Sequence, residues 1–212
     1  MLSVERILGG LVLLKGLDLA LTGSHPAALA VFLVGGVLLL RDRALGWPLV
    51  LTGGLALLAL APLELRRQHL VLLVGIALVA TVARDDGTRL MLWRTQLSAL
   101  YGFAVLAKLN EAFLSGTVMA EALRVPLPLP VLLALGVSLL GVEALLAVTP
   151  WVPRLRTAGT AAAAGLHGVA LLIVAGGPLI ALRLLVFGGA LVLLHAASAG
   201  LVPIRRSCSS RP

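Results

Sequence analysis

The chain has 212 residues, of which 60% are apolar and only 12% are charged. Soluble domains are about half apolar and a quarter charged, so this composition excludes a water-soluble globular fold and a disordered chain. The single cysteine, Cys208, excludes a disulfide scaffold. The formal net charge of +8 raises the question of nucleic acid, but in a membrane protein such charge gathers in cytoplasmic loops.

Apolar runs fill nearly the whole sequence and are separated by short charged or Pro/Gly segments. Because lipid cannot satisfy open backbone groups and the runs do not alternate with period two, we expect an all-α, polytopic membrane bundle of about eight transmembrane helices. It forms one domain over residues 1–204, followed by a cytoplasmic tail at 205–212. The expected spans are Ile7–Thr22, Ala27–Leu40, Ala44–Ala61, His69–Ala83, Leu90–Leu109, Leu129–Thr149, Thr157–Gly176 and Leu179–Leu201.

The N-terminal segment also resembles a signal peptide, because a short charged start precedes an apolar run. Lys15 and Asp18 interrupt that run, so we interpret it as the first retained span. Glycine pairs inside the spans, such as Gly53-Gly54, predict places where two helix backbones pack closely.

The basic residues predict the orientation of the chain in the membrane. With eight spans, eleven fall on one side and four on the other, which places both termini in the cytoplasm. Fifteen arginines against two lysines indicate a GC-rich bacterial source, so the expected location is the inner membrane. The asymmetry between the two sides accounts for the net charge, so we expect the lipid bilayer as a partner and no nucleic acid. The eleven are Arg6, Arg41, Arg43, Arg84, Arg89, Arg94, Arg154, Arg156, Arg205, Arg206 and Arg211, and the four are Arg66, Arg67, Arg124 and Arg183.

Ionisable residues inside a bilayer are costly, so each is a functional hypothesis. Lys15 and Asp18 lie three positions apart and are predicted to neutralise each other on one helix face. Glu143 has no basic residue within a turn and needs a partner from another helix, for which His167 is the candidate. His195 has no predicted partner. No ligand spacing supports a metal site, so no metal is predicted.

Lys108 belongs to a polar stripe, because Arg94, Tyr101 and Lys108 follow one another at intervals of seven residues. Two interpretations remain open for this lysine. Its side chain extends outward to the membrane surface, or it is desolvated and its neutral amine acts as a base.

The segment from Arg94 to Gly116 resembles the signature of the HTTM family, the membrane domain shared by vitamin K-dependent γ-glutamyl carboxylases and bacterial relatives. The matching residues are Arg94, Gln96, Tyr101, Lys108-Leu109, Phe113 and Gly116. Glu143 and His167 keep the family's spacing of 24 between an acidic residue and a histidine, and Gln68-His69 is similar to its Asn-His segment. The resemblance covers residues 68–176, half of the chain.

The resemblance implies a carboxylase-like lyase in which Lys108 deprotonates vitamin K hydroquinone, a menaquinol-type quinol. Oxygenation to the epoxide then drives carboxylation of a glutamate in a protein or peptide partner on the outer side. In this scheme His69 and His167 position the glutamate and CO₂, and Glu143 orients a partner. Tyr101 and Gln96 are the expected cofactor-binding residues.

Two other functions remain open from the sequence. The chain also resembles the small DoxX and MauE membrane subunits, which support a redox partner without catalysis. A transporter would line its pathway with Lys15, Asp18 and Glu143, although no inverted repeat is present.

Overall fold

The structure, a computed structural model, describes residues 3–60, 68–123, 125–174 and 177–204. Within these ranges every regular element is helical and there is no strand, which confirms the all-α prediction. The tail at 205–212, Arg66, Arg67 and Arg124 lie outside the described residues, so the predictions made for them stay predictions.

A long helix occupies each of the eight predicted apolar segments, and together these eight are the helices of 15 or more residues in the described ranges. They are α1 (Val4–Leu21), α2 (Pro26–Leu40), α3 (Gly46–Leu60), α4 (Gln68–Val82), α5 (Asp86–Lys108), α8 (Leu129–Val148), α9 (Arg156–Ile173) and α10 (Pro178–Ser198). Three shorter elements lie between them: α6 (Glu111–Leu114), α7 (Thr117–Ala122) and the 3₁₀ helix η2 (Pro153–Leu155).

Helix length limits what the structure establishes about the membrane. Within the described residues, α8 with 20 residues and α10 with 21 are the two helices long and apolar enough to cross a bilayer. The apolar helices α2, α3 and α4 have 15 residues each, about 22 Å at 1.5 Å per residue, whereas the hydrocarbon core is about 30 Å thick. The evidence that the structure gives for membrane association is therefore the length and apolar composition of α8 and α10.

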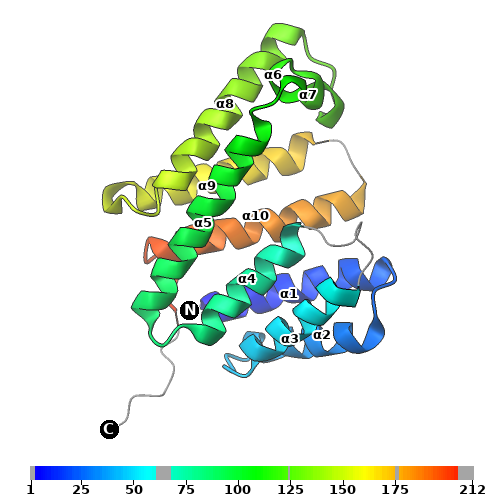
Figure 1. Cartoon of the computed structure of the whole chain (residues 1–212), viewed down its shortest axis with the longest axis vertical. Coiled ribbons are helices and arrows are strands. Elements are labelled where there is room, and N and C mark those ends of the chain that lie inside the picture. Colours follow the sequence, from blue (N-terminus) through cyan, green and yellow to red (C-terminus); the bar gives the residue numbers. More distant parts are fainter. Residues whose placement is uncertain (1–2, 61–67, 124, 175–176, 205–212) are drawn as a thin grey trace.

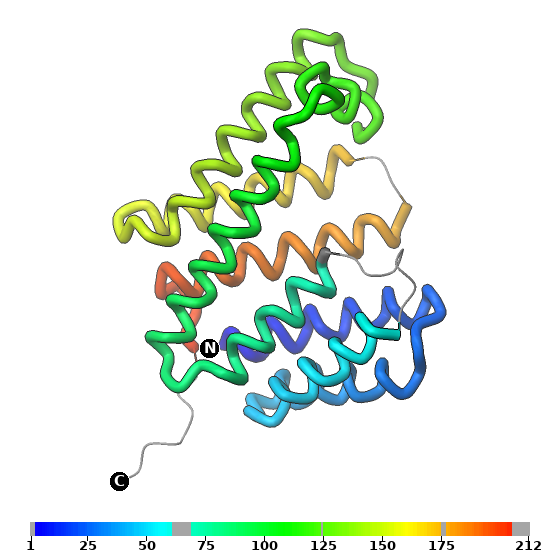
Figure 2. Tube along the Cα trace, viewed as in Figure 1, coloured from blue at the N-terminus to red at the C-terminus, as the bar shows by residue number. Residues whose placement is uncertain are grey.

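The long helices run alternately in opposite directions (Figures 1 and 2). Consecutive helices from α1 to α4 pack against one another, and α8 packs against α5 and α9. Helix α10 joins the two groups, since it contacts α1, α4, α5 and α9. The polar residues discussed below all come from helices that meet around α5 or α10.

Several contacts hold one end of the bundle together. The N–H of Val4 donates to the carbonyl of Pro203 at 3.2 Å, which places the start of α1 beside the end of α10. Arg6 Nε donates to Asp42 in the α2–α3 turn at 2.7 Å. In Figure 1 the α4–α5 and α8–α9 connections lie at this same end.

Helix starts follow the capping chemistry of the sequence. Ser3 accepts the N–H of Arg6 at the start of α1, and Asp85 accepts the N–H of Thr88 at the start of α5. Such side chains satisfy backbone donors that have no partner within the helix.

Glycines allow helices to pack closely, as the glycine pairs predict. A Cβ built on Gly53 would lie 2.5 Å from the backbone nitrogen of Phe32 and 3.0 Å from the carbonyl oxygen of Ala28. Helices α2 and α3 therefore approach at a distance that only glycine permits at this position.

Large apolar side chains occur both in the core and on the outer surface. Trp93 and Ile76 are fully buried, whereas Val137 is 67% exposed, Phe103 70% and Leu172 73%.

Candidate functional site

Helix α5 carries its polar stripe toward three other helices. Tyr101 and Lys108 are seven residues apart, about two helical turns, and so share one face. Each member of the stripe reaches a different helix, which confirms that the face is turned into the bundle. The contacts are Arg94 Nη2 to the carbonyl of Ser198 on α10 at 3.1 Å, Tyr101 to His167 on α9, and Lys108 to Glu143 on α8.

Lys108 forms an ion pair that joins α5 to α8. Its Nζ donates to both carboxylate oxygens of Glu143, at 2.9 and 2.8 Å. The side chain of Lys108 is 25% exposed and that of Glu143 is 10% exposed. Neither open interpretation of Lys108 anticipated this pair, because it depends on how two distant helices pack.

The predicted pairing of Glu143 with His167 is therefore wrong. Glu143 bonds to Lys108, and His167 bonds to the hydroxyl of Tyr101 through Nε2 at 3.0 Å. A lysine side chain is long and cationic, so it reaches across the helix interface and compensates the carboxylate charge better than a neutral imidazole does.

A second histidine lies beside Tyr101. His195 on α10 is fully buried, and its ring centroid is 5.7 Å from that of Tyr101. Among the described residues, neither ring nitrogen of His195 has a hydrogen-bond partner. Tyr101, His167 and His195 thus form one aromatic group at the junction of α5, α9 and α10.

A pocket of about 220 Å³ opens between α9 and α10 next to this group. His167 lies in its wall, and the remaining wall is apolar or glycine, including Gly168, Leu171, Leu185 and Gly188. A Cβ on Gly188 would lie 2.7 Å from the Cβ of His167. Because glycine has no side chain, the side chain of His167 can pack directly against the backbone of Gly188.

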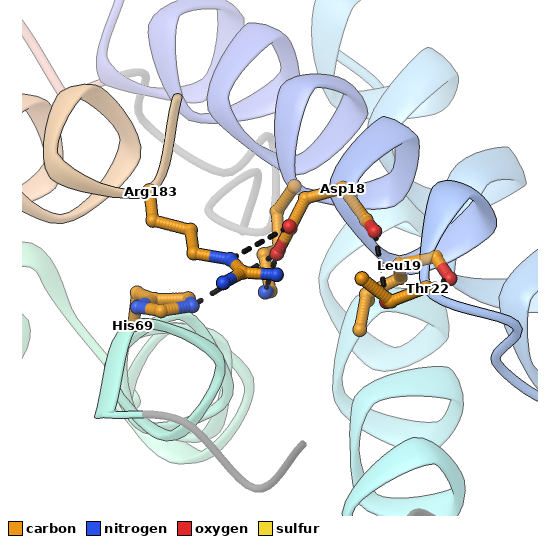
Figure 3. A network of polar contacts seen from close by, with 6 residues as sticks. Asp18, Leu19, Thr22, His69 and Arg183 are labelled. Carbon is orange, nitrogen blue, oxygen red and sulfur yellow. Dashed lines mark hydrogen bonds and ion pairs between the residues drawn. The ribbon is translucent and has the colours of Figure 1, made fainter. Parts of the chain in front are cut away.

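A separate group of charged residues lies between α1, α4 and α10 (Figure 3). Asp18 accepts hydrogen bonds from Lys15 and, at 2.8 Å, from Nε of Arg183. Nε2 of His69 lies 4.0 Å from the same carboxylate. Lys15 and Asp18 on α1 are almost completely buried and bond to each other, which confirms their predicted pairing. Arg183 extends this pair to α10.

The predicted site residues therefore do not form a single site. Lys108, Glu143, Tyr101 and His167 lie along one face of α5, whereas His69 belongs to the group around Asp18. Among the described residues, the polar contacts of Lys108 are to Glu143 and to the carbonyl of Ala104. No contact therefore supports the expectation that Lys108 and His69 share a site.

Gln96 also lies apart from Tyr101, with which it was expected to bind a cofactor. Its Nε2 donates to the carbonyl of Leu72 on α4 at 3.4 Å. The two residues are five positions apart, so they project from different faces of α5.

Two residues of these groups, Arg183 and His195, were not selected as site residues from the sequence. Both interrupt the long apolar run of α10, and polar residues in such a run are the signal that could have identified them. Their partners come from helices distant in the chain, as in the Asp18–Arg183 contact across 165 positions.

The chemistry available at the α5 face is proton exchange. An ammonium bonded to a carboxylate can become a neutral amine beside a neutral acid, and a tyrosine bonded to an imidazole can share a proton in either direction. Across the described part of the chain, no three histidine, cysteine, aspartate or glutamate side chains are placed to hold a metal ion.

A comparison of the chain with protein-family models, curated proteins and solved structures finds no match.

Proposed function

We propose that the protein is a polytopic, eight-span protein of the bacterial inner membrane that binds a hydroquinone and uses Lys108, together with Glu143, to accept its proton. The observation that carries the proposal is the Lys108–Glu143 pair across α5 and α8, with both oxygens within 2.9 Å of Nζ. Ionisable residues within the helices of a membrane protein are candidates for a function.

Exposed apolar side chains and the position of the exposed arginines support a location in the membrane. Strongly exposed apolar side chains such as Leu172 and Phe103 are favourable in lipid and costly in water. Exposed arginines gather at the end of the bundle that contains the start of α1. They are Arg6, Arg41, Arg43, Arg84 and Arg154, and the positive-inside rule then puts this end in the cytoplasm.

Two proton steps move one proton from the hydroquinone to Glu143 by way of Lys108 and leave the hydroquinone as its monoanion. Lys108 gives a proton to Glu143, which leaves a neutral amine beside a neutral carboxylic acid. The amine then accepts the proton of a hydroquinone hydroxyl and becomes an ammonium again. A quarter of the Lys108 side chain is exposed, so a ligand can approach it without opening the bundle.

The residues around the pair suit such a ligand. Tyr101 and His167 lie further along the same helix face and offer one hydroxyl and one imidazole. In the HTTM family that the chain resembles, the oxygenated quinol supplies the strong base for carboxylation of a glutamate. His69 lies with Asp18, so the proposal rests on Lys108, Glu143, Tyr101 and His167.

The experiment measures the hydroquinone reaction directly. The purified protein in lipid nanodiscs is given a naphthohydroquinone, O₂ and CO₂, and the epoxide is quantified by chromatography. We expect epoxide from the native protein and none above background from the variant K108M/E143M, which replaces both charges by apolar groups. The variant E111Q, which removes an exposed charge near Lys108, is the control and should retain the reaction.

Absence of epoxide with the native protein, or equal formation by K108M/E143M, contradicts the proposal. The first result would favour a second candidate, a DoxX- or MauE-like subunit that supports a redox partner without chemistry of its own. The observation in favour of that candidate is the same ion pair, because a lysine held by both oxygens of Glu143 also serves to join α5 to α8.

A further inference from the structure

The pocket between α9 and α10 is open at the outer face of the bundle. Gly168 in its wall is exposed and Leu185 is 45% exposed. If the helices span a bilayer, as proposed above, the mouth of this pocket faces lipid, and a ligand would enter from the membrane rather than from water. The inference below therefore rests on the proposed membrane location and hydroquinone ligand.

His167 supplies the polar group of the pocket. Its Nε2 is engaged by Tyr101, and Nδ1 makes no hydrogen bond within the described residues. A Cβ built on Gly188, another residue of the pocket wall, would lie 3.4 Å from Nδ1, so this nitrogen is at the pocket. One accessible nitrogen in an otherwise apolar wall selects a ligand that is mainly apolar and carries a hydrogen-bonding atom.

The bond to Tyr101 determines what Nδ1 can do. When the tyrosine hydroxyl donates to Nε2, Nδ1 carries a hydrogen and donates to a carbonyl oxygen. When Nε2 donates to the tyrosine oxygen, Nδ1 is an acceptor and takes the hydrogen of a hydroxyl. The same imidazole therefore matches both a quinone, which has carbonyls, and a hydroquinone, which has hydroxyls.

The size of the pocket limits the ligand. Sites for drug-sized molecules have volumes of about 300–1,000 Å³, and this pocket has about 220 Å³. It holds a single ring system and leaves any hydrocarbon tail in the membrane.

We propose that the α9–α10 pocket binds the ring of a quinone or hydroquinone from the bilayer, with His167 Nδ1 on a ring oxygen, as a docking position distinct from Lys108. Tyr101, the partner of His167, and Lys108 are separated by seven residues of α5, about 10 Å along the helix axis. A ring seated at His167 therefore has to move along α5 before Lys108 can take its proton.

Two glycines of α9 provide a matched pair of variants. Gly168 lies in the pocket wall, whereas Gly165, one turn earlier, is outside the set of lining residues. A Cβ at either position meets no atom within 4 Å, so a side chain can leave the helix at both sites without a clash at its first carbon. G168L should fill the pocket mouth, and G165L should add the same side chain to the same helix with no effect on the pocket.

The test is photolabelling of the full chain in nanodiscs with an azido-naphthoquinone, followed by mapping of the labelled peptides. We expect label on α9 and α10, suppressed by excess 2-methyl-naphthoquinone. We expect about ten-fold less label in G168L and in H167F, which removes the nitrogen but keeps a ring, a loss typical of one good ligand contact. Label should be unchanged in G165L.

Label that maps beside Lys108 on α5 and α8, or that is equal in G168L and the native chain, overturns the docking position and leaves the proposed function standing. Label that is suppressed by a long-chain fatty acid but not by the naphthoquinone assigns the pocket to a lipid tail and also overturns it. If excess naphthoquinone suppresses no label anywhere in the chain, both the docking position and the proposed function fail.

Discussion

The polar side chains in the interior of this protein are paired with residues of other helices. Lys108 bonds to Glu143 and Tyr101 bonds to His167, so each polar side chain of the α5 face is compensated by another helix. Breaking a buried ion pair by removing one partner leaves a charge without compensation, which costs more than replacing both partners.

The first prediction concerns this pair. K108M leaves Glu143, which is 8% exposed, without its counter-ion, and we expect the free energy of unfolding to fall by about 2 kcal/mol. K108M/E143M should lose about 1 kcal/mol or less, because both groups are then apolar. Thermal unfolding in nanodiscs, followed by circular dichroism, measures both. A double variant less stable than K108M contradicts the predicted compensation.

A second prediction at the residue scale concerns Asp85, which lies in the connection before α5. The backbone N–H and the hydroxyl of Thr88 donate to its carboxylate and lower the pKa of Asp85 below the ordinary value of 3.8. Below pH 3.8 the unfolded chain takes up this proton first, so the contribution of Asp85 to stability is present above that pH and is lost as pH falls through the lowered pKa.

D85N keeps a good capping residue but has no proton to gain. We therefore expect its melting temperature to fall less than that of the native protein between pH 5 and pH 3. Equal slopes for the two proteins in that range would show that Asp85 is not the group responsible.

At the scale of elements, helix positions follow from local sequence and helix contacts do not. Each long helix overlaps one predicted apolar segment, because charged residues, prolines and glycines interrupt the apolar runs. Spacing within one helix also predicted the α5 stripe and the Lys15–Asp18 pair. The partner of Glu143 and the role of Arg183 could not be predicted, since both depend on which helices become neighbours after folding.

The close approach of α2 and α3 gives a prediction at this scale. A methyl group at Gly53 would collide with the backbone of Phe32, and backbone cannot move aside as a side chain can. G53A should therefore destabilise the protein by about 1–3 kcal/mol. G10A on α1, where a Cβ meets nothing within 4 Å, should be neutral or stabilising by up to about 1 kcal/mol. Equal melting temperatures for the two variants would contradict the close packing.

At the scale of the whole molecule, α10 connects the first four helices to α5, α8 and α9. The Asp18–Arg183 contact is the charged part of that connection. Two helices of membrane length, an apolar exterior and arginines at one end agree with insertion into a bilayer. The sequence predicts a membrane protein from composition because apolar content is a property of the whole chain, and the two helices long and apolar enough to cross a bilayer are in favour of it.

Loss of the Asp18 carboxylate should loosen α10 from α1. We expect D18N to lower the free energy of unfolding by about 3 kcal/mol and to increase hydrogen exchange in α10. The control D42N removes a carboxylate that, within the described residues, bonds to Ser3 and Arg6 and not to α10, so hydrogen exchange in α10 should not change. Exchange in α10 that is the same in D18N and D42N would contradict the joining role.

Nitrogen NMR of the lysine side chains detects whether a hydroquinone hydroxyl bonds and passes its proton to Lys108. The chain has two lysines, Lys15 and Lys108, so a sample labelled with ¹⁵N-lysine gives two Nζ signals, and K108M identifies one of them. Addition of a naphthohydroquinone in bilayers should shift the Lys108 signal and leave that of Lys15 in place, and its dimethyl ether, which has no hydroxyl proton, should not reproduce the shift. A Lys108 signal unchanged at saturating hydroquinone, or shifted equally by the ether, contradicts the account.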